Sequence, residues 1–259
     1  MRMMKKFLGM VTVLALSVSL PAGCGSTAAS PVSSAASTAA ESTTSAVVSE
    51  MTSAAADENA AAAAQLLNDL TGSYQELWPV ILADEYQQTW LDDCTALVGE
   101  ENAEAAFEKL SSMVTGDVYG EDAVEAYANG GGAYFCGFTN DLATLTFDGE
   151  ASTISGTDKD GNELFSHPYH YIGMEPVRGL YEFESDDADS GEFTYFFLAP
   201  DTSAETYHIE FRYGSDADAL SQYDAGDYAY WLASGISTDC DQTMIDNCIE
   251  LFCTENLAG

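Results

Sequence analysis

The spacing of apolar residues changes abruptly at the run Gly130–Gly132. Before it, apolar side chains recur every three or four residues, which is typical of amphipathic helices. After it they recur every second residue, which is typical of strands that bury one face. The folded part of the chain is therefore expected to contain helices first and then a series of short strands.

The same patterns give approximate bounds for these elements. Helical spacing is found at residues 60–67, 73–82 and 101–113, and again near the end at 216–223 and 241–252. Alternating spacing is found at residues 133–138, 142–147, 163–172, 180–183, 193–198 and 207–213. Asp160-Gly161 is a hairpin signal, and Asp186–Gly191 is a second polar turn between strands. Short turns of this kind join antiparallel strands, so we expect a mainly β fold with helices: a curved antiparallel sheet or small barrel closed by N- and C-terminal helices.

The N-terminus has the features of an export signal. Basic residues within Met1–Lys6 precede an apolar run at residues 7–20, and Pro21-Ala22-Gly23 precede Cys24. The run is too short for a membrane-spanning helix. We expect residues 1–23 to be a lipoprotein signal peptide and Cys24 to be lipidated, although Pro21 stands where the lipoprotein pattern has an aliphatic residue; an ordinary signal peptide is the alternative. The expected location is the outer face of the cytoplasmic membrane of a bacterium, at the cell surface.

A low-complexity segment separates Cys24 from the folded part. Residues 25–56 are mostly Ser, Thr and Ala and contain no aromatic side chain, so they cannot bury enough apolar surface to order themselves. We interpret residues 24–59 as a flexible tether with a reach of about 30 Å. Residues 60–259 form the expected folded domain.

The charge of the chain restricts its partners. There are 43 acidic residues against 7 basic ones, a formal net charge of −36. A surface of this kind repels phosphate backbones, which excludes a nucleic-acid binder. Because 46% of the residues are hydrophobic, the chain still has the material for a packed core.

Five cysteines remain besides Cys24, an odd number without a C-x-x-C pair. Export permits disulfides, but the sequence assigns none. A thiolate zinc site among Cys240, Cys248 and Cys253 is conceivable, but their spacing matches no common zinc motif. Buried structural thiols are the favoured interpretation.

Two stretches resemble a known family. The first is Leu67–Leu82, and the second runs from Asp189–Tyr195 through Ala199-Pro200 and Tyr207-His208-Ile209 to Asp227–Trp231. Together they are similar to the ZinT domain, a periplasmic zinc-binding calycin that also forms the C-terminal half of the zinc receptor AdcA. The resemblance covers about residues 66–254. It implies a lipocalin-like (calycin) barrel that binds Zn2+ and delivers it to a metal ABC importer.

The family's zinc ligands are only partly present. The resemblance implies three His ligands: one before the Ala-Pro and a His-x-His pair on the next strand. His208 matches the second member of that pair, Thr206 stands at the first, and the Ala-Pro segment is shortened. One ligand of three is retained, and zinc sites in proteins use three or four.

Other residues could complete a relocated site. Glu210 lies two residues after His208 and is expected on the same strand face. His167 and His170 are the only other imidazoles, and their spacing of three places them on opposite faces of a regular strand, which Pro168 is expected to disturb. We therefore take His208, His170, His167 and Glu210 as candidate ligands of zinc or a related divalent cation. The alternative is that each His is a solvated or hydrogen-bonded strand residue.

Two other kinds of site are disfavoured. Asp158–Glu163 lacks the glycine and the later bidentate acid of a calcium loop, so a hairpin turn is the better interpretation. No H-E-x-x-H, G-x-S-x-G or phosphate-binding glycine loop is present, and we expect no enzymatic activity.

Three functions are therefore open. The first is a metal-binding protein for metal acquisition or homeostasis. The second is a calycin-type module that has lost the metal and holds a small apolar ligand or a protein partner against a tyrosine-rich wall, formed by Tyr195, Tyr207, Tyr213, Tyr228 and Tyr230. The third is an adhesin or spacer.

Overall fold

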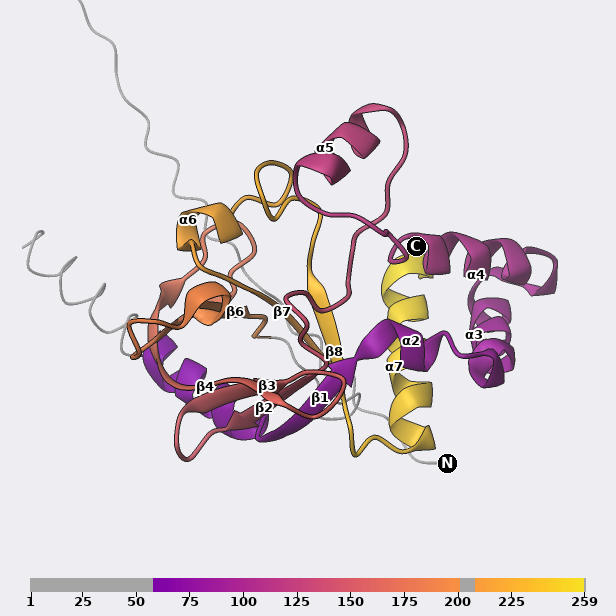
Figure 1. Cartoon of the computed structure of the whole chain (residues 1–259). Coiled ribbons are helices and arrows are strands. Elements are labelled where there is room, and N and C mark those ends of the chain that lie inside the picture. Colours follow the sequence, from indigo (N-terminus) through magenta and orange to yellow (C-terminus); the bar gives the residue numbers. More distant parts are fainter. Residues whose placement is uncertain (1–57, 201–207, 259) are drawn as a thin grey trace, which may run out of the picture. The chain divides into compact units, whose positions relative to one another are not determined.

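Eight antiparallel strands close into a barrel in which each strand pairs with its neighbours in the sequence (Figure 1). The computed structural model describes residues 58–200 and 208–258. The strands are β1 (Gly72–Glu76), β2 (Thr144–Asp148), β3 (Thr153–Thr157), β4 (Glu163–Met174), β5 (Tyr181–Ser185), β6 (Tyr195–Leu198), β7 (His208–Gly214) and β8 (Ala233–Ser237). The last strand pairs with the first, Gln75 opposite Ile236, and this pairing closes the barrel. The expected barrel of calycin type is confirmed.

Aromatic side chains fill the inside of the barrel. Phe147, Phe183 and Phe211 are at most 1% exposed, and the rings of Phe196 and Tyr213 stack 5.3 Å apart. Space is so limited that Gly156 has no room for a Cβ, which would collide with the side chains of Leu142 and Phe165. The interior is thus a packed core of the kind found in small barrels.

A helix at residues 58–69 packs against this core. Its buried residues Ala63, Leu66 and Leu67, together with Leu70 just after it, belong to the same apolar cluster as the barrel interior. They recur at spacings of three and four, so one stripe of the helix faces the barrel.

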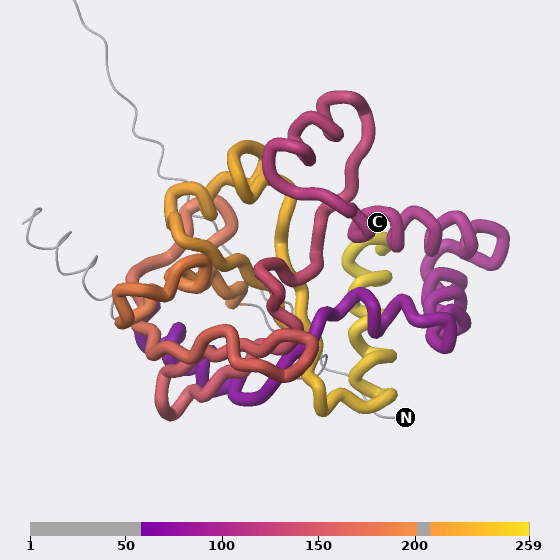
Figure 2. The backbone as a smooth tube through the Cα atoms, viewed as in Figure 1, coloured from indigo at the N-terminus to yellow at the C-terminus, as the bar shows by residue number. Residues whose placement is uncertain are grey.

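A second core lies outside the barrel, beneath a layer of helices. The layer consists of α2 (Leu77–Ile81), α3 (Gln87–Val98), α4 (Ala103–Ser112) and α7 (Gln242–Leu257), with short 3-10 turns η1 (Asp84–Tyr86) and η2 (Glu100–Asn102) between them. The C-terminal helix α7 lies beside α3 although the two are far apart in the sequence (Figure 2). Trp90 is fully buried between them, and its ring meets those of Phe107 and Phe252. Three further short helices complete the structure: α5 (Glu121–Ala128), η3 (Gly191–Phe193) and α6 (Ala217–Leu220).

A fully buried arginine holds the segment that connects β7 to β8 by hydrogen bonds. The guanidinium of Arg212 donates to the carbonyl oxygens of Leu220, Gln222 and Tyr228. Its Cζ lies 4.4 Å from the ring centroid of Tyr223, and Arg178 lies at the same distance from that ring. Burial lowers the pKa of Arg212, yet a guanidinium stays charged in proteins. The charge is therefore stabilised by carbonyl dipoles and an aromatic face instead of a carboxylate.

Arg212→Met should destabilise the protein strongly. The substitution keeps the volume but leaves three carbonyl groups without their donor, of which that of Leu220 lies in a fully buried residue, so we expect a loss of about 3 kcal/mol or more in the free energy of unfolding. Denaturant unfolding measures it. Lys159→Met, an exposed hairpin position, is the matched control and should change stability by less than about 0.5 kcal/mol. Equal stabilities of the two variants would contradict the role given to Arg212.

The contact between α3 and α7 carries repulsive charge. The pKa of Asp93 on α3 is raised by burial first and then by Glu250, Asp246 and Asp92, of which the first two lie on α7. A carboxyl group with a raised pKa binds more protons in the folded state than in the unfolded state. The stability added by its protonation is present at low pH and is lost as the pH rises through the folded pKa.

Asp93→Asn should therefore stabilise the protein at pH 7, by roughly a few tenths of a kcal/mol for this half-exposed group. It should also flatten the decrease in stability that the parent undergoes between pH 4 and pH 7. Thermal unfolding across this range measures both effects. Glu150→Gln, in an exposed turn, should leave the pH profile unchanged. A variant less stable than the parent at pH 7 would show that Asp93 is not repelled.

Several elements differ from the sequence-based expectation. Residues 73–76 form β1 instead of the start of a helix, because strand pairing with β2 and β8 outweighs their helical spacing. Residues 133–138 make only two isolated bridges, from Phe135 to Thr115 and to Trp231, and β3, β8, α3 and α5 were not anticipated. The turns at Asp160-Gly161 and Asp186–Gly191 do connect strands as predicted: Asp158 accepts from the amides of Asp160 and Asn162, which confirms a hairpin turn.

The predictions for the N-terminal region fall on residues 1–57 almost entirely, and these lie outside the described residues. The signal peptide at 1–23, the lipidated Cys24 and the tether at 24–59 therefore remain predictions. Within the part of the chain that is described, no helix has the length and apolar character needed to cross a membrane.

Candidate metal centre

Three polar side chains form a row across β4, β5 and β6. His170 is paired with Glu184, and Glu184 is paired with Tyr195 on the next strand. The neighbouring residues Tyr169, Phe183 and Phe196 are buried in the barrel core, so the row lies on the outer face of the wall. The Tyr195 hydroxyl donates to Glu184 Oε1 at 3.1 Å. Burial, followed by the Glu184 carboxylate, raises the pKa of Tyr195, which keeps this hydroxyl protonated as a donor.

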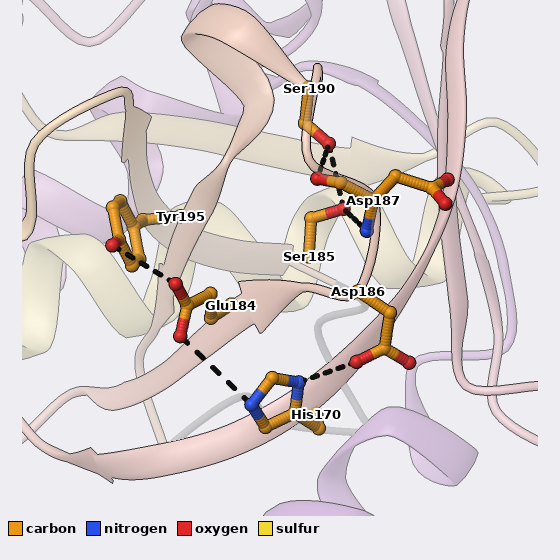
Figure 3. A network of polar contacts seen from close by, with 7 residues as sticks. All are labelled: His170, Glu184, Ser185, Asp186, Asp187, Ser190 and Tyr195. Carbon is orange, nitrogen blue, oxygen red and sulfur yellow. Dashed lines mark hydrogen bonds and ion pairs between the residues drawn. The ribbon is translucent and has the colours of Figure 1, made fainter.

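His170 is held between two carboxylates (Figure 3). Its Nδ1 lies 2.7 Å from Asp186 Oδ1, and its Nε2 lies 4.0 Å from Glu184 Oε2. An ionised carboxylate only accepts hydrogen bonds, so Nδ1 is the nitrogen that carries the proton. In the neutral ring the lone pair is then on Nε2 and faces the Glu184 carboxylate.

This is the arrangement that proteins use to orient a metal-binding imidazole. A ligating His donates its other ring N–H to a carboxylate, which fixes the tautomer and increases the basicity of the free nitrogen. The 4.0 Å gap is close to the sum, about 4.2 Å, of a zinc–nitrogen and a zinc–oxygen bond. A small rotation of the partly exposed Glu184 that shortens the gap to about 3.4 Å gives a tetrahedral angle.

A second pair lies on the other face of the same strand. His167 Nδ1 is 2.8 Å from Asp187 Oδ2, and the imidazole stacks on the ring of Phe165. Asp186 and Asp187 are consecutive, so they reach opposite faces of β4 and each binds one of its imidazoles. The sequence predicted opposite faces for His167 and His170, and this is confirmed; β4 continues through Pro168.

The turn that presents the two acids is held by buried serines. The Ser190 hydroxyl donates to Ser185 Oγ at 2.8 Å and approaches the carbonyl oxygen of Asp187 at 2.9 Å, and Ser185 Oγ accepts from the Asp187 amide (Figure 3). Ser185 and Ser190 are 8% and 6% exposed, so water competes little for these bonds. The backbone that presents both acids is therefore held by the turn itself.

The centre offers two protein ligands. Asp186 binds the far side of the His170 ring and does not point at the space between Nε2 and Glu184. Over residues 58–200 and 208–258, no three His, Cys, Asp or Glu side chains form a group suited to a metal ion. A cation here would be held by His170 and Glu184 and would keep several of its waters.

His208 and Glu210 lie elsewhere, on the outer face of β7. They share that face as predicted, because the intervening Ile209 is buried in the barrel core. Both line a small hollow of about 40 Å³ beneath α7, together with Cys248 and Glu255. Burial first, and then Cys240 and Glu210, raises the pKa of the Cys248 thiol to about 12, so this sulfur is protonated at neutral pH.

The structure does not bring His208 together with His167 or His170. Strands β5 and β6 lie between β4 and β7, and the row that contains His170 meets β7 at Gly214, six residues from His208. That is roughly 20 Å along the strand and about 14 Å across the sheet. The four candidate ligands are thus divided between three places, the two faces of β4 and the outer face of β7, and the carboxylates that accompany His170 are Glu184 and Asp186 instead of Glu210.

The tyrosines proposed as one binding wall are also separated. Tyr213 is fully buried in the barrel interior, Tyr195 lies on its outer face, and Tyr230 stacks on Tyr127 with ring centroids 3.6 Å apart. Tyr207 lies outside the described residues. A hollow of about 370 Å³ does lie outside the barrel, next to α2, and its walls include Trp78, Phe135 and Cys136. Its size is that of a small-molecule site, but its lining is not the predicted tyrosine wall.

No family model matches the chain, and no curated protein sequence matches it. Among solved structures, it is similar to the Zn(II)-bound ZinT-like domain of Streptococcus pneumoniae AdcA, with a TM-score of 0.45 and 15% identity over 71% of this chain and 89% of that one. It is also similar to Zn(II)-bound AdcA from the same organism, with a TM-score of 0.41 and 14% identity over 74% of this chain. The match covers 35% of that longer chain.

Proposed function

We propose that this protein is an exported, lipid-anchored binding protein for a divalent cation, with zinc as the expected ion and His170 as its main ligand. The observation that carries the proposal is the orientation of His170: Nδ1 bonds Asp186 and Nε2 faces Glu184. Imidazole with carboxylate suits zinc better than magnesium or calcium, which prefer oxygen ligands alone.

The small number of protein ligands is in keeping with transfer of the ion instead of storage. A cation that keeps several waters exchanges more readily than one in a closed site of four ligands. The acidic surface raises the local concentration of cations, and this effect extends about 8 Å in physiological salt. Delivery to a metal ABC importer, which the sequence resemblance implies, would use such an exchangeable site.

Calorimetric titration of zinc into the metal-free mature protein at pH 7 tests the site. We expect His170→Ala to weaken binding at least about tenfold, because it removes a ligand, and Asp186→Asn to weaken it about 10- to 100-fold through the orientation of the ring. Binding should also weaken as the pH is lowered, since protons compete for the imidazole.

His208→Ala is the matched control for this titration, because it removes an imidazole from the outer face of another strand. It should bind zinc as the parent does. The reverse result, with binding lost in His208→Ala and kept in His170→Ala, would move the site to β7 and Glu210. A parent protein that takes up no zinc would reject the metal function and favour an organic ligand or a protein partner.

Lipid anchoring is tested by fractionating bacterial cells that express the full chain. We expect the parent protein in the membrane fraction and Cys24→Ala released from it, because the substitution removes the thiol that would carry the proposed lipid. Cys240→Ala controls for the loss of a thiol and should remain with the membrane. Membrane retention of Cys24→Ala would contradict anchoring at this residue.

A further inference from the structure

Two cysteines from opposite ends of the domain meet in the helical core. Cys94 on α3 and Cys253 on α7 are both fully buried, and their sulfur atoms are 3.9 Å apart. They are 159 positions apart in the sequence. A disulfide requires a sulfur separation of about 2.05 Å, so a shift of about 1 Å by each sulfur is enough.

The geometry points to a disulfide between Cys94 and Cys253, and we propose that the mature exported protein carries it. The bond would form in the oxidising surroundings that the proposed export provides. The remaining thiols of the folded domain, Cys136, Cys240 and Cys248, would stay reduced.

Charges of the same sign face each other across the contact between α3 and α7. Asp93, next to Cys94, is repelled by Asp246 and Glu250 on α7. The apolar contact around Trp90 opposes this repulsion, and a covalent bond at the same place would hold the helices together regardless of charge.

The burial of both sulfurs determines when the bond can form. Burial raises the pKa of Cys94 and of Cys253, and the thiolate is the form that attacks a disulfide. The folded protein should therefore be oxidised slowly, while the chain should be oxidised readily during folding, before α7 docks. Once formed, the bond should be shielded from reductants for the same reason.

The reaction is an ordinary thiol–disulfide exchange with a disulfide-bearing oxidant, such as an exported oxidoreductase or oxidised glutathione. The thiolate of one cysteine attacks a sulfur of the oxidant, whose S–S bond breaks and releases one thiolate. The second cysteine thiolate attacks the mixed disulfide and releases the other. The two protons lost by the cysteines are taken up by the two released thiolates, so the cysteine pair is oxidised by two electrons and the oxidant is reduced by two.

Refolding of the denatured, reduced mature chain in a buffer of oxidised and reduced glutathione tests the pairing. After alkylation in denaturant, peptide mass spectrometry should find the peptides of Cys94 and Cys253 linked, and the other three cysteines of the domain alkylated. The folded, reduced protein placed in the same buffer should form the link at least about tenfold more slowly. Alkylated Cys94 and Cys253 after refolding, or a link from either one to another cysteine, would overturn the proposal.

Thermal unfolding gives an independent measurement that does not depend on export or on zinc. The oxidised protein should unfold about 10 °C above the reduced one, because the bond closes a long loop. Cys94→Ala and Cys253→Ala should lose this difference between oxidised and reduced samples, and Cys248→Ala, a change at another buried cysteine, should keep it. The comparison is made within each variant, so a general loss of stability does not affect it.

The same mass spectra, taken on protein isolated from the membrane fraction, show whether the bond is present in the cell. Free thiols at Cys94 and Cys253 in that sample would overturn the proposal for the exported protein, whatever its zinc content.

Discussion

The pairing of β1 with β8 is the interaction on which most of the other features depend. Each of these strands is followed in the chain by segments that leave the barrel on its helical side: α2 and α3 after β1, and α7 after β8. When the two strands pair, these helices begin next to one another, and their apolar faces can cover the same part of the wall. Helices α2, α3 and α7 accordingly lie on the same side of the barrel (Figure 1). The second core, which contains Trp90, Cys94 and Cys253, therefore follows from the closure of the barrel. Closure also removes the two open edges that would otherwise attract other strands.

Because aromatic rings fill the interior of the barrel, polar side chains that could bind a ligand lie on its outer face. In larger barrels of this architecture the interior can hold a ligand, but here the rings of Phe165 and Tyr169 on β4 meet the ring of Phe196 on β6, two strands away, inside the barrel. Polar groups that face outward are then arranged by strand register, and His170, Glu184 and Tyr195 lie in one row because their strands pair at those positions. The serine-braced turn after β5 adds Asp186. The candidate centre is therefore a product of the sheet's register and of a single turn.

The sequence was informative where one strand face is buried and the other is not. Strands β4, β5 and β7 alternate clearly and were predicted, whereas β8, with the sequence Ala-Ser-Gly-Ile-Ser, has too few large side chains to show a period. Leu77 and Trp78 extend a helical spacing backwards into β1, and only pairing with two other strands overrides it. The two helices that were missed, α3 and α5, bury few residues, so their apolar stripes are narrow.

The candidate site was predictable only in part, and the reason is spatial. A sequence shows that His170 is an imidazole on a strand, and that residues two apart share a face, as His208 and Glu210 do. It does not show which strands are neighbours. A ligand set that combines residues of β4 with residues of β7 requires these two strands to be adjacent, and β5 and β6 lie between them. Two consecutive acids just after a strand that follows a His-containing strand, here Asp186 and Asp187, were the available signal. Antiparallel neighbours joined by a short turn are adjacent in a meander, and because β4 is longer than β5, the acids that follow β5 lie beside the middle of β4. Carboxylates on the strand that follows β4, or just after it, were therefore better candidate partners for His170 than Glu210. Glu210 lies on β7, the strand of His208.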